Sequence, residues 1–119
     1  MSLDEQVALA LGWTRSRSHS EECEFWHLPG DVFPPVGVHH RLPPAYSTDI
    51  AASEELIKKM NAMDLVVIEA RGSSLDLTEV YNDTELVFEV NGTVCENRCR
   101  AFLAVKATPV ARYVAPPRP

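Results

Sequence analysis

Residues 47–70, STDIAASEELIKKMNAMDLVVIEA, place a helix directly before a strand and decide the fold class. Ser47 or Thr48 can cap the helix, and Asp49 suits the positive end of the helix dipole. Apolar side chains recur on one side and charged side chains lie mostly on the other. The apolar set is Ile50, Ala52, Leu56, Ile57, Met60 and Met63, and the charged set is Glu54, Glu55, Lys58 and Lys59. Residues 65–70 have the β-branched density of a strand.

The N-terminal region predicts a short helix followed by a short strand. Ser2 and Glu5 have the spacing of a capping box, and an apolar stripe follows before Gly12 ends the pattern. The stripe consists of Leu3, Val7, Ala10 and Leu11. Residues 23–28 contain Phe25 and Trp26 and end at a Pro-Gly turn signal, which predicts a strand.

The C-terminal half predicts a hairpin and a last helix. A polar stretch runs from Gly72 to about Thr84, and residues 86–90 then alternate as a strand does. Asn91-Gly92 is the preferred dipeptide of a two-residue hairpin, so the chain should turn there into a strand over 93–95. Asn97 can cap a helix that ends before Pro109. Cys99, Phe102, Leu103 and Lys106 share one face of it.

Length and composition favour a single folded domain. The chain has 119 residues, 45% of them hydrophobic and 24% charged, which is enough for one hydrophobic core. We expect a single α+β domain over residues 1–108, built as a layered sandwich of a small, mainly antiparallel sheet of about four strands with about three helices. Residues 109–119 are rich in proline and should form a flexible tail.

The expected location is the cytoplasm. No apolar run approaches the roughly 20 residues of a membrane-spanning helix, and Asp4 and Glu5 stand where a secretory signal carries positive charge. The three cysteines should therefore be reduced thiols.

The charge balance opposes nucleic-acid binding. Net charge is -6, whereas affinity for DNA or RNA comes largely from Lys and Arg that neutralise phosphates. Two small basic clusters stand out in the sequence, and both have acidic neighbours. They are Arg15 and Arg17 with His19, near Glu21 and Glu22, and Arg98 with Arg100, near Glu96. Solvated surface is the expected role of both.

The sequence gives little support for metal binding or catalysis. Cys23 and His27 are four residues apart, as are Cys95 and Cys99, but neither spacing matches a zinc ribbon or finger. We expect Cys95 and Cys99 to lie on different elements. The sequence lacks a nucleophile elbow, a phosphate-binding glycine loop and an HExxH pair. No catalytic, cofactor-binding or metal-binding residue is therefore assigned, no cofactor is expected, and the protein is predicted not to be an enzyme.

One long loop remains. Residues 31–45 contain four prolines and the pair His39-His40, the only groups of this loop that titrate near neutrality. An exposed connector is the expected structure, and a ligand-covering lid is the alternative.

Two stretches, Pro43–Ala52 (PPAYSTDIAA) and Cys99–Val105 (CRAFLAV), resemble the signature segments of the phage ABA sandwich domain family. The resemblance covers the chain from the first helix to Ala107. It implies layered helices and sheet and a phage or prophage context, with no established chemistry. This chain departs from the family in having Ser53-Glu54-Glu55 where members commonly carry a tryptophan.

The order of helix, three strands and helix over 48–107 is also similar to the double-stranded RNA-binding domain. That resemblance would give Arg98 and Arg100 a role at phosphates.

These observations predict a phage or prophage accessory protein of unknown biochemical role that is not an enzyme. It would act through contacts with a protein partner or with itself, and nucleic acid and membrane are not expected partners. The alternative is a protein that binds a small ligand or nucleotide signal in counter-defence, with the 31–45 loop as its lid.

Overall fold

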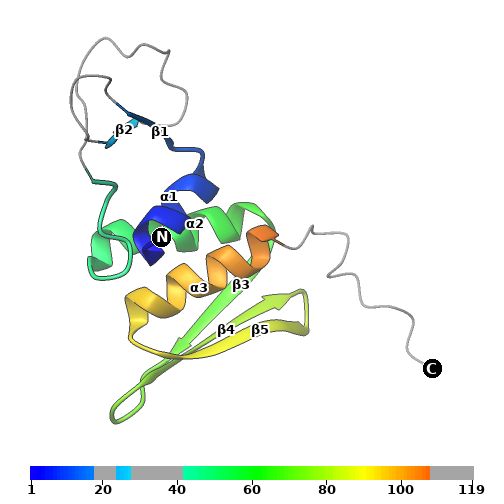
Figure 1. Ribbon diagram of the computed structural model, residues 1–119. Helices are drawn as coiled ribbons and strands as arrows, with labels where there is room; N and C mark the ends of the chain where they lie inside the picture. The colour runs from blue at the N-terminus through cyan, green and yellow to red at the C-terminus, as the bar shows by residue number, and fades with distance from the viewer. Residues whose placement is uncertain (18–23, 28–41, 108–119) are drawn as a thin grey trace. The chain divides into compact units, whose positions relative to one another are not determined.

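The computed structural model describes residues 1–17, 24–27 and 42–107 (Figure 1). The chain divides into two compact units, Met1–Pro44 and Ala45–Pro119, and each is described by itself. The first contains α1 (Leu3–Leu11), β1 (Thr14–Arg17) and β2 (Glu24–His27). The second contains α2 (Ile50–Ala62), β3 (Leu65–Ala70), β4 (Asp76–Asn82), β5 (Glu85–Gly92) and α3 (Val94–Ala107). The expected α+β class with three helices is confirmed, and the described strands form two antiparallel sheets, one of two strands and one of three.

In the first unit, α1 begins and ends where the sequence predicts. The Glu5 N–H donates to Ser2 Oγ at 3.2 Å and the Ser2 N–H donates to Glu5 Oε1 at 3.0 Å, which completes the capping box. The hydrogen bond from the Ser2 backbone N–H to its carboxylate lowers the pKa of Glu5. Gly12 ends the helix with a φ of 100°, a backbone conformation that glycine adopts without strain.

The small sheet of the first unit pairs the strand predicted over residues 23–28 with a strand that was not predicted. β2 lies within the expected range 23–28, and β1 pairs with it so that Thr14 faces His27 and Arg15 faces Trp26. The Arg15 guanidinium carbon lies 5.8 Å from the centroid of the Trp26 ring, within the range of a cation–π contact.

In the second unit, α2 is capped by Asp49, not by Ser47 or Thr48. Asp49 Oδ1 accepts the Ala51 N–H at 3.0 Å. The buried side of α2 consists of Ser53, Leu56 and Met60. The predicted apolar face was too broad, because Ile50 is 54% exposed.

The three-stranded sheet has the order β3-β4-β5 and carries both long helices on one side (Figure 1). α2 packs against β3 and α3, and α3 packs against β4 and β5. Leu65, Thr78 and Val80 are the buried strand residues beneath these helices.

The region after Gly72 differs from the prediction in several places. The polar stretch contains β4, and the tight turn to β5 lies at Asp83, whose φ is 60°. Asn91-Gly92 forms the end of β5 and not a hairpin, and residues 94 and 95 belong to α3. Thr93, not Asn97, caps that helix: its Oγ1 accepts the Glu96 N–H at 3.4 Å.

Asn97 instead joins α3 to the sheet. Its side chain is completely buried, and Nδ2 donates to the Asp76 carbonyl at 2.8 Å and to the Gly92 carbonyl at 3.3 Å. A Cβ at Gly92 would lie 2.8 Å from Asn97 Oδ1, which is too close for an unstrained contact. Gly92 is therefore required for this close approach and not for a turn.

The β4–β5 ladder contains one β-bulge. Val80 pairs with Phe88 and Tyr81 pairs with Leu86, so Val87 has no partner in the register. Such a bulge changes which face the following side chains occupy.

Candidate functional site

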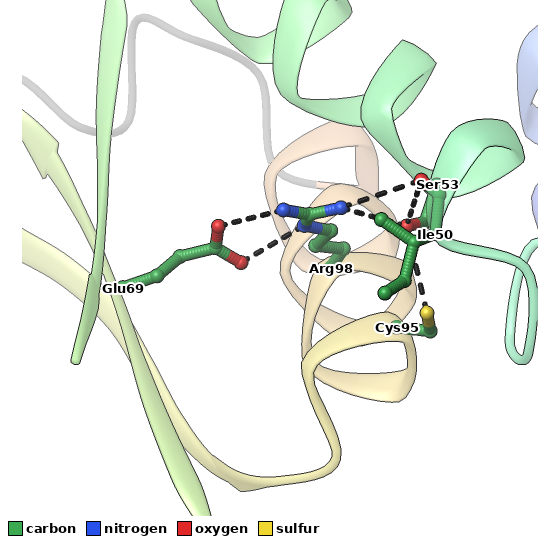
Figure 2. Close-up of polar contacts among 5 residues, drawn as sticks. All are labelled: Ile50, Ser53, Glu69, Cys95 and Arg98. Carbon is green, nitrogen blue, oxygen red and sulfur yellow. Dashed lines mark hydrogen bonds and ion pairs between the residues drawn. The ribbon is translucent and has the colours of Figure 1, made fainter. Parts of the chain in front are cut away.

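A polar cluster centred on Arg98 connects three elements among the described residues of the second unit (Figure 2). Nε and Nη2 of Arg98 donate to the two carboxylate oxygens of Glu69 at 2.9 and 2.8 Å. Nη1 donates to Ser53 Oγ at 2.9 Å and to the Ile50 carbonyl at 3.5 Å. One guanidinium on α3 thus contacts both β3 and the first turn of α2.

The chemistry of this cluster is that of a structural connection. The hydrogen bonds to Glu69 raise the pKa of Arg98, so the guanidinium stays charged. The Ser53 hydroxyl accepts from Arg98 and donates to the Ile50 carbonyl at 2.9 Å, and its oxygen lies 3.7 Å from Cys95 Sγ. None of these partners is a base that could take the Ser53 proton, so the arrangement fits no nucleophile–base pair.

The arginines that the sequence offered as phosphate contacts have partners within the chain. The Arg98 side chain is only 11% exposed and pairs with Glu69. Arg100 lies further along α3, 3.4 Å from a Glu96 oxygen. In the first unit, Arg15 lies 3.8 Å from a Glu5 oxygen. The Arg17 side chain and His19 lie outside the described residues.

The structure corrects one expectation about the cysteine and histidine pairs. Cys95 and Cys99 were expected on different elements, but both lie on α3, where both are buried. His27 is buried in β2, and Cys23 lies outside the described residues. Within residues 1–17, 24–27 and 42–107, no group of three or more His, Cys, Asp or Glu side chains could hold a metal ion. Residues 31–41, with His39-His40, and the tail 109–119 also lie outside the described residues.

A different surface results from the register of the second sheet. Cross-strand partners share a face, and the side away from α2 and α3 carries three rows, which we call the open face. The rows are Val66–Tyr81–Leu86, Ile68–Glu79–Glu89 and Ala70–Leu77–Asn91. Val66, Ile68 and Leu86 are 52%, 48% and 45% exposed.

The polar side chains of the open face gather toward its β4 and β5 strands. The Tyr81 hydroxyl donates to Glu79 Oε2 at 3.0 Å, and this hydrogen bond raises the pKa of Tyr81. Glu79 and Glu89 are direct cross-strand partners, an arrangement of like charges that is unfavourable in an isolated sheet. The β3 column of Val66, Ile68 and Ala70 carries no charge.

The open face was not predicted because β4 was not predicted. Leu77, Glu79 and Tyr81 alternate with the buried Thr78 and Val80. The burial of these residues alternates with period two but their hydropathy does not, because buried Thr78 is polar and the less buried Leu77 is apolar.

No helix within the described part of the chain is long and apolar enough to cross a membrane. Comparison of the chain with protein-family models, with curated proteins and with solved structures finds no match.

Proposed function

We propose that this chain is a non-enzymatic accessory protein of a phage or prophage, and that it acts by binding another protein through the open face. The phage context rests on the resemblance of Pro43–Ala52 and Cys99–Val105 to the phage ABA sandwich family. The genes that flank its own are accordingly expected to encode phage proteins.

The observation that carries the binding role is the row Val66–Tyr81–Leu86. Two of its three side chains are aliphatic and about half exposed, and the row spans all strands of the sheet. Contiguous exposed apolar surface of this kind is typical of interaction sites. A tyrosine at its centre adds an amphipathic group of the type enriched in protein interfaces.

The Arg98 cluster supports a role without catalysis. The Arg98 guanidinium and the Glu69 carboxylate bind each other. The Ser53 hydroxyl donates to a backbone carbonyl, which is not a base that could activate it as a nucleophile. The groups best placed for chemistry in the second unit thus serve to hold α2, α3 and β3 together.

Two leucines of similar exposure provide the test. Leu86 lies on the open face and is 45% exposed, and Leu75 lies between β3 and β4 and is 54% exposed. A variant that carries a photo-crosslinking amino acid at position 86 and is expressed in the native cells should form a discrete covalent complex with a partner protein. The same group at position 75 should not.

The partner identified by mass spectrometry is then purified and titrated against two variants. Leu86→Lys should raise its Kd about 10-fold or more, since it places a charge in a buried apolar contact. Leu75→Lys should leave the Kd unchanged. Equal effects of the two substitutions, or no effect of Leu86→Lys, would refute the open face as the binding site.

A further inference from the structure

The two edges of the three-stranded sheet differ in how they are protected. β3 and β5 are the edge strands, and an unprotected edge can pair with another strand. β5 carries Glu85 and Glu89 and contains the bulge at Val87. Charges and bulges are two of the devices that prevent edge pairing.

β3 has neither device along its central residues. Its sequence is Leu65-Val66-Val67-Ile68-Glu69-Ala70, and its register with β4 is regular over all six residues. Its one charged side chain, Glu69, is bound by Arg98 of the same chain at 2.8 Å. In the described part of the chain, β3 pairs with β4 alone.

We propose that β3 pairs antiparallel with β3 of a second copy of this chain, about a two-fold axis at Val67, to form a continuous six-stranded sheet. The inference extends the proposed function, because it assigns an occupant to the β3 edge of the open face. Strand addition of this kind supplies main-chain hydrogen bonds for affinity, and the facing side chains set the register.

The exposed side chains of β3 fit this register. With Val67 opposite itself, Val66 of each copy faces Ile68 of the other, so two apolar cross-strand pairs form on the open face. These side chains are about half exposed in the single chain. Paired β-branched side chains stabilise a sheet, and the two uncharged columns would then lie side by side.

The acidic residues of the open face favour an edge contact between copies over a face-to-face contact. Each chain carries a net charge of -6, so two copies carry like net charges that oppose association. The acidic Glu79–Glu89 row would oppose itself in a face-to-face dimer. In the edge pairing, by contrast, both acidic residues stay away from the two-fold axis, and added salt should strengthen the dimer by screening the remaining repulsion.

Two double variants that differ at one position test the register. The first, V66K/I68K, places like charges opposite each other across the axis. The second, V66E/I68K, places opposite charges there instead. The lysine introduced by Ile68→Lys lies beside Glu79 within the chain in both variants, so the two differ only in the charge at position 66.

Sedimentation equilibrium of the full chain gives the readout, with circular dichroism to verify that each variant is folded. The wild type and the V66E/I68K variant should dimerise. The V66K/I68K variant should be monomeric, with a dimer Kd raised about 10-fold or more, and Leu75→Lys should match the wild type.

A wild type that is still monomeric at about 100 μM would overturn the proposal, because its dimer Kd would then lie well above this concentration. Equal behaviour of the two double variants would also overturn it, because the proposed register requires that they differ. The partner titration with Leu86→Lys is independent, since β5 lies two strands from β3, about 10 Å away at the usual strand spacing. Failure of the dimer and failure of the binding face are therefore separate results.

Discussion

Asn97 and Gly92 form a contact whose energy can be tested with a double-mutant cycle. Asn97→Ala removes the two hydrogen bonds from Nδ2 to the carbonyls of Asp76 and Gly92. Gly92→Ala leaves these groups in place but puts a Cβ 2.8 Å from Asn97 Oδ1. The two substitutions damage the same contact in different ways, so their effects should not add.

The expected magnitude follows from burial and hydrogen bonding. Two hydrogen bonds at about 1 kcal/mol each give a loss of about 2 kcal/mol for Asn97→Ala. Asn97 Oδ1 is buried and has no hydrogen-bond partner among the described residues. Its removal eliminates an unfavourable buried group and therefore offsets part of the lost stability. Gly92→Ala should cost roughly 1–3 kcal/mol, because Nδ2 is fixed at two carbonyls and Oδ1 cannot move away easily. With Asn97 already shortened to Ala, the same Cβ meets no oxygen and should cost close to nothing.

Urea unfolding followed by circular dichroism at 222 nm measures all four proteins. Fluorescence is unsuitable because both tryptophans, Trp13 and Trp26, lie outside the second unit. In a thermal scan followed by the same signal, Asn97→Ala should lower the melting temperature by about 10 °C, as expected for a loss of this size in a small domain. Asn97→Asp, nearly the same shape, should cost more, because it turns a carboxylate oxygen toward two carbonyls. Additive effects of Gly92→Ala and Asn97→Ala would refute the assigned contact.

Four further outcomes are expected. Leu56→Asp should unfold the second unit because Leu56 is completely buried, whereas Ile57→Asp, at a half-buried position, should leave a folded protein with a lower melting temperature. Glu69→Gln should cost roughly 1–2 kcal/mol by thermal melting at low salt, and less at high salt, since it removes one charge of a bidentate pair. Glu79→Gln should bring the raised pKa of Tyr81 closer to its ordinary value in a ¹³C NMR titration. Because the pKa of Tyr81 is raised in the folded protein, the stabilisation by its hydrogen bond to Glu79 is present below the ordinary pKa. It is lost as the pH rises through the pKa of the folded protein. A gel-shift titration with duplex DNA or RNA at physiological salt should show no binding with a Kd below about 10 μM. Salt-sensitive binding with a lower Kd would contradict the protein-binding role.

Elements with a local signal could be predicted from the sequence. The capping box and the glycine after α1 fixed both ends of that helix, because these interactions involve residues only a few positions apart. The amphipathic pattern located α2, and β-branched residues located β3. The capping residue of α2 was missed by one or two positions because Ser47, Thr48 and Asp49 can all cap a helix.

Elements that depend on distant contacts could not be predicted. Asn91-Gly92 has the strongest local turn signal in the chain, yet Gly92 is needed beside Asn97, five residues later, for packing. Asp83 makes the turn instead, in a left-handed conformation that aspartate tolerates. β4 was hidden because its buried positions include Thr78 and its less buried ones include Glu79, so its composition resembles that of a loop.

The candidate site shows the same limit. Arg98 attracted attention as a cation near a helix start, but nothing local revealed that Glu69, 29 residues earlier, binds it. The open face requires three strands in register, and one of them was absent from the prediction.

The bulge at Val87 bears on how this protein can tolerate changes of length. Val87 is the one β5 residue without a partner in the ladder, so deleting it would straighten the strand and preserve every remaining pair. Deleting Glu89 instead would move the residues before it by one position and exchange the two faces of that part of the strand. Leu86 would then turn toward the helices. Val87 is therefore the position in β5 where a one-residue deletion should be tolerated, and neighbouring deletions should destroy both the core and the open face.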